Sequence, residues 1–252
     1  MRSWFRPIPI LDPAEIAGTF PLAGGWTRFA QVECLEPGRA PRVLPAADLD
    51  AGSLERLSAA RPAFAGLDLS RPRLMGVLNV TPDSFSDGGA HLDPSAALRR
   101  ARAMVAEGVD LIDIGGESTR PGAAETPEAE EIARITPVLQ SLQRAGLRVP
   151  LSLDTRKSAV ARAGLAAGAD VLNDVSGLRH DAALADVAAE AGAPLIVMYS
   201  LGTPETMQAL AVDAYDDVVL DVLETMEKTI AQAEAAGVPR GRILVDPGIG
   251  FG

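Results

Sequence analysis

The sequence predicts an α/β protein, a TIM (β/α)8 barrel with about six βα units present and an N-terminal extension. From residue 73 onward, short apolar runs rich in Val, Ile and Leu alternate with alanine-rich helical stretches. This alternation is typical of a parallel sheet whose strands are covered by helices. Almost every apolar run also ends in a polar residue on the same side of its strand. That pattern favours a barrel, because all strands of a barrel end at one mouth.

The six apolar runs are the predicted strands, and the alanine-rich stretches are the predicted helices. The strands cover 74–80, 109–115, 149–155, 170–175, 194–200 and 242–248. The helices include 94–108, 157–168 and 215–237, and each of these stretches ends in glycine, the usual stop signal before a strand. A further helical stretch, 125–135, begins with an acidic turn that suits the helix dipole.

The residues near the strand ends are predicted to share one face of the sheet. Side chains alternate between the two faces with a period of two residues, and this period assigns one face to Asn79, Asp113, Asp154, Asn173, Met198 and Asp246. In an open doubly wound sheet, only the strands beside the switch point bring such groups together. No G-x-G-x-x-G motif follows a strand, which weakens a dinucleotide-binding interpretation further.

Residues 1–72 differ in composition from residues 73–252, and we expect them to form a separate N-terminal extension. They are rich in proline and arginine, contain both tryptophans and show one helical stretch, 51–60. Two interpretations stay open on these cues: an extension partly ordered against the main body, or a flexible appendage.

Charge and composition limit the classes of function. The 252-residue chain has a net charge of −11, which disfavours nucleic acid as a partner. Residues 1–72 hold eight arginines and eight acidic residues, so residues 73–252 carry the remaining 15 basic and 26 acidic residues. An anionic substrate there needs a metal ion or a local cluster of arginines. The single cysteine, the absence of an apolar run of about 18 residues and the absence of a secretory signal predict a cytoplasmic protein with no membrane partner.

The stretch "GVLNVTPDSFSDGG", 76–89, is the first candidate for chemistry. A strand ends at Asn79, whose amide oxygen is a suitable ligand for a hard cation such as Mg²⁺. The chain then breaks at Pro82 into a loop that contains Asp83. These residue types are also ordinary in turns, but the loop is longer than a βα connection needs, and long loops in compact folds are often functional.

The stretch "IDIGGESTRPGA", 112–123, is the second candidate. Asp113 is an acid near a strand end, and a Gly-Gly pair, two hydroxyl residues and Arg120 follow it. Consecutive backbone N–H groups, hydroxyls and an arginine indicate a cradle for phosphate or pyrophosphate. The alternative is a glycine-rich connector with a solvated arginine.

Three further strand ends, "SLDTRKS", "LNDVSG" and "LVDPGIGFG", supply Asp154, Asn173 and Asp246. Buried carboxylates need hydrogen-bond donors. A flat nitrogen heterocycle with an amino–amide edge, such as a pterin, supplies an N–H and NH₂ pair. A purely structural role is common for any one such residue, but three together favour a ligand site.

Other charged residues near these strand ends are less specific. Arg156 and Lys157 either help to bind an anion or cap the helix that starts there. Asp174 points to the opposite face by the two-residue period, so we expect it to be structural.

These stretches resemble dihydropteroate synthase, a pterin-binding TIM-barrel family of folate biosynthesis. "LMGVLNVTPDSFSDGG" and "IDIGGESTRPGA" are similar to its two signature loops, and the three shorter motifs follow in the same order and spacing. The resemblance covers roughly residues 70–252. It implies a transferase that condenses 6-hydroxymethyl-7,8-dihydropterin diphosphate with 4-aminobenzoate, giving 7,8-dihydropteroate and diphosphate with Mg²⁺. It also implies a homodimer for the full-length protein.

The resemblance implies roles for individual residues. The residues that hold the pterin are Asp113, Asp154, Asn173 and Asp246, with Met198 packed on it. Asn79 is implied as a ligand of Mg²⁺ or of the diphosphate. The loop residues implied at the diphosphate and aminobenzoate sites are Pro82, Asp83, Phe85, Thr119, Arg120, Gly248 and Phe251. We assign the catalytic roles to Asp113, Asp154, Asp246 and Arg120.

The sequence departs from the family pattern in two places. Tyr199 stands where the family usually has histidine, which either weakens a phosphate-side contact or is neutral. The family also continues past "GFG" with a lysine and two more strands. Because a barrel needs eight strands to close, we expect this chain to be truncated before strands seven and eight and to have low activity.

Two alternative functions remain. One is a pterin-dependent methyltransferase that binds methyltetrahydrofolate, although both signature loops argue against it because methyl transfer releases no diphosphate. The other is a non-catalytic pterin-binding or assembly subunit. Comparing the binding of pterin diphosphate and methyltetrahydrofolate separates the two enzymes.

Overall fold

The computed structural model describes residues 3–11, 17–81, 94–118, 125–202 and 215–251. By the packing of its backbone, the chain divides into two units, Met1–Pro72 and Arg73–Gly252.

The first unit is an antiparallel sheet with one helix. Its elements are β1 (Trp4–Ile10), β2 (Phe20–Pro21), β3 (Arg28–Leu35), β4 (Arg42–Pro45), the 3-10 turn η1 (Ala46–Asp48) and α1 (Ala51–Ser58). The strand β3 pairs with the other three strands. Three buried residues, Phe29, Val32 and Ala46, form a small core, and partly buried apolar side chains of the same unit pack against it.

The helix predicted at 51–60 is confirmed as α1, and Asp50 caps it by accepting a 2.9 Å hydrogen bond from the Ser53 N–H. The four strands were not predicted. Prolines interrupt their alternation at Pro7, Pro9 and Pro45, and proline weakens a strand assignment made from sequence.

The second unit contains all six predicted strands and the helices between them. Its elements are β5 (Met75–Asn79), α2 (Pro94–Ala106), β6 (Leu111–Gly115), α3 (Glu128–Arg144), β7 (Leu151–Asp154), α4 (Ser158–Ala167), β8 (Val171–Asp174), α5 (Ala183–Ala191), β9 (Leu195–Met198), α7 (Val218–Ala235), the 3-10 turn η4 (Arg240–Arg242) and β10 (Ile243–Asp246). The predicted glycine stop after α4 is seen at Gly168, in the left-handed conformation, and Gly192 ends α5 in the same way.

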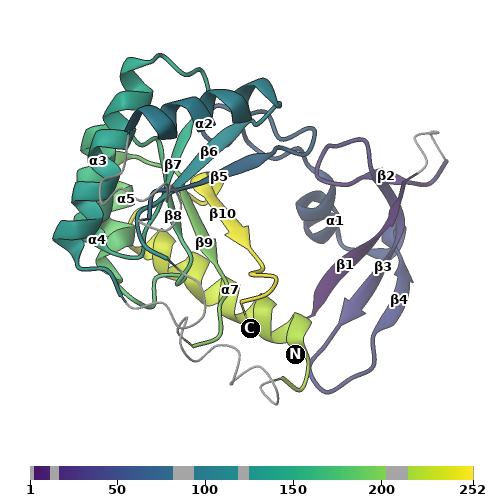
Figure 1. The fold of residues 1–252 in the computed structure, drawn as a ribbon. Helices are drawn as coiled ribbons and strands as arrows, with labels where there is room; N and C mark the ends of the chain where they lie inside the picture. Colours follow the sequence, from purple (N-terminus) through teal and green to yellow (C-terminus); the bar gives the residue numbers. More distant parts are fainter. Residues whose placement is uncertain (1–2, 12–16, 82–93, 119–124, 203–214, 252) are drawn as a thin grey trace. The chain divides into compact units, whose positions relative to one another are not determined.

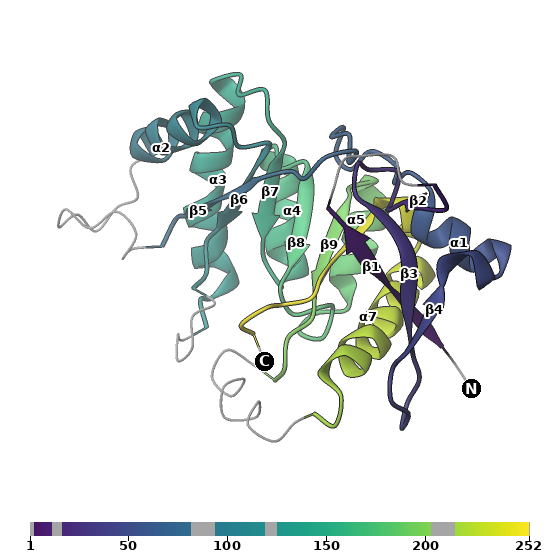
Figure 2. The ribbon, with the colours of Figure 1, turned by 90° about the vertical axis from the view of Figure 1, so that its right-hand side faces the viewer.

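The strand order identifies the architecture of the second unit. The six strands are parallel and run β5-β6-β7-β8-β9-β10 across the sheet, in the same order as in the sequence. A doubly wound sheet reverses its order at a switch point and carries helices on both faces. Here the order never reverses, and the helices lie along one face of a curved sheet (Figures 1 and 2). This is the arrangement of consecutive βα units in a TIM barrel.

The core of the second unit lies between the sheet and its helices. Alternate strand residues, among them Ile112, Leu153 and Leu172, are completely buried against helix residues such as Leu139. Because successive side chains point to opposite faces, the remaining strand residues face the interior of the barrel. The two-residue period therefore separates residues of the core from residues available to a site.

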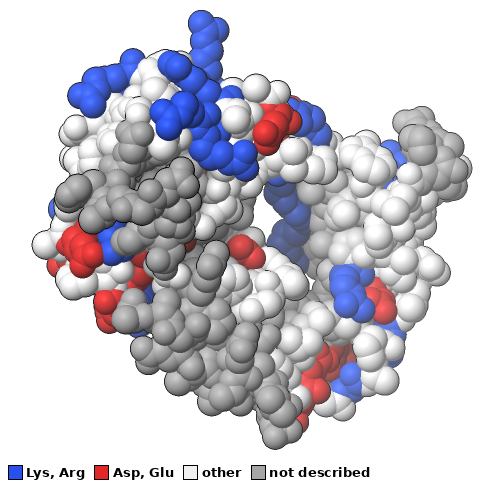
Figure 3. All heavy atoms as spheres, in the orientation of Figure 1, with Lys and Arg blue, Asp and Glu red and all other residues white. Residues whose placement is uncertain are grey.

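The outer surface of the helices is largely polar. On α2 the arginines Arg99, Arg100 and Arg102 are exposed, and Figure 3 shows basic side chains gathered over this helix. Among the helices that the structure describes, none has the length and apolar character needed to cross a membrane.

Candidate active site

Four residues at the carboxyl ends of neighbouring strands lie at one level of the sheet. Asn79 on β5 pairs with Gly115 on β6, Gly115 pairs with Asp154 on β7, and Asp154 pairs with Asn173 on β8. Residues in register on parallel strands project their side chains to the same face. The predicted common face of Asn79, Asp154 and Asn173 is therefore confirmed, while their roles toward a ligand stay predictions.

Asp113 lies one layer deeper on this face. It pairs with Ser152, and its Oδ2 accepts a 3.0 Å hydrogen bond from the Asn173 Nδ2. Asp113 is only 5% exposed. Among the described residues, Asp113 Oδ1 and Ser152 Oγ are buried and have no hydrogen-bond partner. Since unpaired buried polar atoms are costly, this layer has hydrogen-bonding capacity for a ligand.

The two inward carboxyl groups are electrostatically coupled. Burial raises the pKa of Asp113, and the nearby Ser152 hydroxyl and the Asn173 amide offset this only in part. Burial also raises the pKa of Asp154 well above its usual range, and the charge of Asp113 raises it further. Perturbed carboxyl groups that converge in one place are typical of functional sites.

Gly115 keeps a gap open between two of the inward oxygens. A Cβ atom at this position would lie 3.4 Å from Asn79 Oδ1 and 3.4 Å from Asp154 Oδ2. The two oxygens therefore face the same small space from opposite sides of Gly115. Any side chain at this position would fill that space.

The β9 and β10 ends complete the same edge of the sheet. Met198 is in register with Asp246 and is 4% exposed. Asp246 Oδ1 accepts a 2.8 Å hydrogen bond from the Gly248 N–H, and the Phe251 N–H donates to the Gly248 carbonyl at 2.9 Å. Gly248 has a φ of +67°, and a Cβ there would collide with the carbonyl oxygen of Tyr199, so the turn requires glycine.

Tyr199 has a structural contact of its own. Its hydroxyl donates to Asp221 Oδ2 at 2.6 Å, in the first turn of α7, and lies 3.2 Å from the Tyr215 hydroxyl. Burial, together with these two neighbours, raises the pKa of the Tyr199 hydroxyl. The hydroxyl therefore ties β9 to α7, a contact that the sequence did not indicate.

Asp174 is structural, as its orientation predicted. It is completely buried, and burial raises its pKa. Its carboxylate accepts hydrogen bonds from the Ser176 N–H at 2.8 Å and the Leu178 N–H at 2.6 Å. It therefore organises the turn after β8.

Lys157 and Arg156 both contact buried carboxylates, and the predicted capping role of Lys157 is wrong. Lys157 is 3% exposed, and its Nζ lies 3.0 Å from Glu117 Oε1 and 2.8 Å from Glu131 Oε2. Arg156 Nε lies 2.9 Å from Glu117 Oε2. The Lys157 side chain does not cap α4. Glu117, Glu131 and the Thr126 carbonyl accept the three hydrogen bonds of Lys157, while anion binding by Arg156 stays a prediction.

Charge pairing controls ionisation within this buried cluster. Burial opposes the charge of Glu117, but hydrogen bonds from Arg156, the Thr126 N–H and Lys157 bring its pKa below the usual value. Burial raises the pKa of Glu131 despite its contact with Lys157. Burial alone would lower the pKa of Lys157, yet its two carboxylate partners raise it. Lys157 is therefore a charged residue inside the fold.

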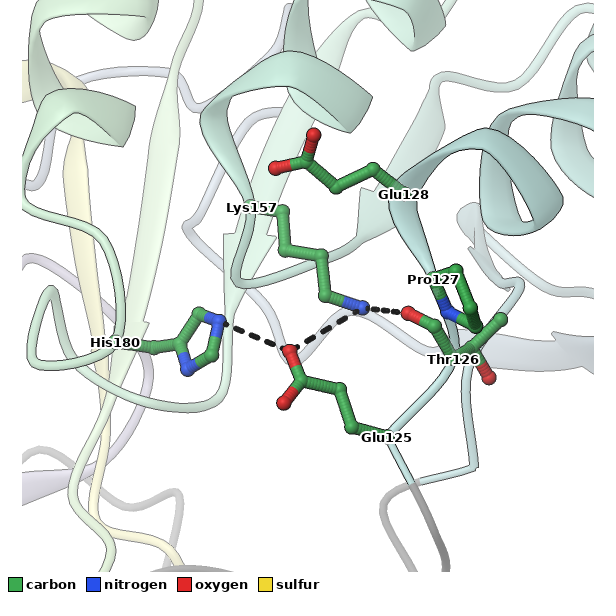
Figure 4. Close-up of a pocket in the computed structure, with 6 residues that line it drawn as sticks. All are labelled: Glu125, Thr126, Pro127, Glu128, Lys157 and His180. Atoms are coloured by element: carbon green, nitrogen blue, oxygen red, sulfur yellow. Dashed lines mark hydrogen bonds and ion pairs between the residues drawn. The ribbon is translucent and has the colours of Figure 1, made fainter.

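A polar pocket of about 290 Å³ lies beside this cluster (Figure 4). His180 Nε2 lies 3.4 Å from Glu125 Oε1, and Lys157 Nζ lies 4.0 Å from the same oxygen. The lining comes from three βα connections and comprises Glu125, Thr126, Pro127, Glu128, Lys157 and His180. Neither the cluster nor the pocket was predicted, because residues about 40 positions apart leave no local pattern in the sequence.

Several predicted site residues lie outside the described part of the chain. In the first signature loop they are Pro82, Asp83 and Phe85, and in the second they are Thr119 and Arg120. Their roles stay predictions.

Comparison with known proteins identifies the family. A family model described as pterin binding enzyme matches residues 75–252. The chain belongs to the pterin-binding enzyme family. It is 45% identical over 186 residues to dihydropteroate synthase of Escherichia coli, an alignment that covers 74% of this chain and 64% of that protein.

Solved structures agree with this assignment. Dihydropteroate synthase of Xanthomonas albilineans with 4-aminobenzoic acid is 46% identical with a TM-score of 0.67, and the match covers 75% of this chain and 66% of that chain. The Burkholderia cenocepacia enzyme complexed with 7,8-dihydropteroate is 46% identical with a TM-score of 0.63, covering 74% and 61%. The family resemblance and the TIM-barrel class are confirmed. The chain spans a little less than two thirds of the length of these relatives.

Proposed function

We propose that the second unit binds a pterin on the inner face of its sheet, against Asp113, Asp154 and Asn173. The observation that carries this proposal is the buried Oδ1 of Asp113, which has no hydrogen-bond partner and whose carboxyl group lies near that of Asp154. The amino and ring N–H groups of a pterin are donors that such oxygens lack. Asp246 adds a further carboxylate at the same edge, and Met198 offers an apolar surface for the ring.

We infer that the reaction is that of a dihydropteroate synthase, as the related enzymes from three bacteria suggest. The amine nitrogen of 4-aminobenzoate bonds to the methylene carbon of the dihydropterin, the carbon–oxygen bond to diphosphate breaks, and the nitrogen loses a proton. An aromatic amine is already nucleophilic, so orientation and charge stabilisation are the main tasks of the protein. The carboxylates Asp113, Asp154 and Asp246 stabilise positive charge that develops on the ring.

Residues of the two signature loops act on the other substrate groups in this proposal. Thr119 and Arg120 bind the diphosphate as it leaves, and Pro82, Asp83 and Phe85 help to enclose it. Phe251 lines the aminobenzoate site, and Gly248 permits the turn that places Phe251 there. These roles rest on the family resemblance.

The residues present fit a bound Mg²⁺. Asn79 Oδ1 and Asp154 Oδ2 both face the gap at Gly115, and Mg²⁺ is commonly held by one or two protein oxygens with substrate phosphates and water. The described residues contain no group of three or more His, Cys, Asp or Glu side chains suited to a metal. We propose Asn79 as the ligand, and the ion when bound neutralises charge on the diphosphate. The expected cytoplasmic location and homodimer stay predictions.

Binding of 6-hydroxymethyl-7,8-dihydropterin to the chain, measured by calorimetry, tests the proposed site. We expect Asp113→Asn and Asp154→Asn each to weaken binding by about 10- to 100-fold, the value of one hydrogen bond to a charged group. Asp186→Asn, which changes an exposed carboxylate on α5, is the matched control and should bind as the wild type does.

Formation of 7,8-dihydropteroate from both substrates, followed by chromatography, tests the reaction. A chain that binds methyltetrahydrofolate but not the dihydropterin diphosphate would contradict the proposal and favour a methyltransferase. Binding of the pterin without product formation, in a sample whose folding is verified, would favour a non-catalytic subunit.

A further inference from the structure

Hydrogen bonds close the base of the second signature loop. Glu117 and Thr126 flank residues 118–125, and the Thr126 N–H donates to Glu117 Oε1 at 2.7 Å. Glu117 is 6% exposed and Thr126 is 7% exposed. The two ends of this eight-residue stretch are therefore joined directly, inside the fold.

Lys157 reinforces this junction from a neighbouring strand end. Its Nζ donates to the Thr126 carbonyl at 2.5 Å (Figure 4). It also donates to Glu117 Oε1 at 3.0 Å, so one ammonium group contacts both ends of the stretch. Its third hydrogen bond, 2.8 Å long, goes to Glu131 in the first turn of α3. An ammonium group has three donors, and all three are used here.

Arg134 on α3 makes a second connection between the same two ends. Its guanidinium donates to the Gly116 carbonyl at 2.7 Å and to the Thr126 Oγ1 at 3.4 Å. Gly116 also packs closely on α3, because a Cβ there would lie 2.7 Å from Ile135 Cγ2 and 3.0 Å from Glu131 Cγ. The junction is thus fixed against α3 as well as against the β7–α4 connection, which supplies Lys157.

A purely stabilising role does not explain why Lys157 and Arg134 both donate hydrogen bonds to the two ends of the same stretch. Buried ion pairs contribute little net stability compared with apolar packing, since removing charges from water is costly. Lys157 and Arg134 nevertheless both bind the two ends of one connection at the mouth of the barrel. Joining the ends of a loop in advance removes conformational freedom that would otherwise be lost when a ligand is bound.

We propose that Lys157 and Arg134 are positioning residues that set where the second signature loop leaves and rejoins the barrel. This inference rests on the proposed function, in which that loop supplies Thr119 and Arg120 to the diphosphate. The two cations act through the loop and touch no substrate. Their effect is therefore confined to the diphosphate half of the substrate, while the pterin ring is held independently by the inner face of the sheet.

Calorimetry with two probes, in the presence of Mg²⁺, measures this effect. The probes are 6-hydroxymethyl-7,8-dihydropterin and its diphosphate, which differ only in the group that the loop is proposed to bind. The first variant combines Lys157→Met with Glu131→Leu, so that no buried carboxylate loses its cation, since Glu117 keeps Arg156. The second variant is Arg134→Met, whose ion-pair partner Glu130 is largely exposed. The control is Arg162→Met, which removes a cation from an exposed pair with Glu190.

We expect the Lys157→Met/Glu131→Leu and Arg134→Met variants each to reduce the preference for the diphosphate probe by about tenfold or more. Binding of the unphosphorylated pterin should be unchanged. The control should keep the full preference. Arg120→Ala alone should lose the preference too, and combining it with Arg134→Met should add little, because coupled residues are not additive.

Three results would overturn the inference. Equally weakened binding of both probes shows a general structural role. An unchanged preference for the diphosphate probe in Arg134→Met shows that Arg134 does not act on the loop. Full additivity with Arg120→Ala shows that the two residues act separately. A wild-type chain with no preference for the diphosphate probe refutes the proposed function itself, and is distinguished from these results because it appears before any substitution.

Discussion

Replacing Gly115 by alanine should raise the stability of the fold and weaken the binding of the ligand. Gly115 lies within β6, buried between Asn79 and Asp154. The added methyl carbon would lie 3.4 Å from Asn79 Oδ1, 3.4 Å from Asp154 Oδ2 and 3.7 Å from Asp154 Cβ. These are ordinary contact distances, so the fold accepts the methyl group without displacement of its neighbours.

The expected magnitudes follow from this geometry. A glycine inside a strand is less favourable than alanine by about 0.5–1 kcal/mol, so Gly115→Ala should gain that much free energy of unfolding. For a unit of this size the gain raises Tm by about 1–4 °C. The same methyl group fills the gap that the two oxygens face. We expect the affinity for the dihydropterin to fall about tenfold or more, because the proposed contact with Asp154 Oδ2 is blocked.

Thermal unfolding and calorimetric binding of one preparation check both halves of this prediction. Gly76→Ala is the matched control, since it is also a strand glycine, but its Cβ would meet Met104 and Val109 on the helix-covered face. The control should lose stability slightly and keep its affinity for the pterin. A Gly115→Ala chain that binds the pterin as tightly as the wild type would refute the proposed contact between the pterin and Asp154 Oδ2.

Three further predictions concern charges and hydroxyls. Folding raises the pKa values of Asp113 and Asp154, so protonation of these two residues stabilises the folded state. This contribution to the free energy of unfolding is fully present below the unfolded pKa of about 3.9, and it is lost as pH rises through the folded pKa values. Urea unfolding should thus show a steeper loss of stability as pH rises above about 4 in the wild type than in Asp154→Asn, and parallel curves would contradict this. Lys157→Met alone should cost about 3–5 kcal/mol, because it leaves buried carboxylates without their cation; a loss below about 1 kcal/mol by urea unfolding would show that the cluster is not stabilised by this charge. Tyr199→Phe should cost about 1–2 kcal/mol through the lost hydrogen bond to Asp221, with pterin affinity unchanged, and a weaker affinity would place the hydroxyl in the site instead.

The sequence predicted the sheet of the second unit well because its signals were local. Apolar strands, glycine stops and the two-residue period placed Asn79, Asp154 and Asn173 on one face, and the register confirms this. The period also separated Asp174 from them correctly. These features depend on neighbouring residues alone, which is why a single sequence carries them.

The misses share a different cause. Lys157 and Glu117 are 40 positions apart, and only the pairing of β6 with β7 brings them together. Without that geometry, a basic residue at a helix start looks like an anion ligand or a cap. In the first unit, prolines interrupt the strand pattern of β1 and β4. These strands are held by pairing with β3, which is also a tertiary feature.

The single helical layer has a consequence for how this unit tolerates mutation. In a strand as short as β7, Leu151 and Leu153 belong to the core while Ser152 and Asp154 face the barrel interior. In a deep mutational scan, the effect of substitutions should therefore alternate along each strand. Substitutions at core positions should lower the abundance of the protein, and substitutions at the interior-facing positions between them should impair ligand-dependent function. Specificity could then be redesigned at every second position while the packing positions are left as they are.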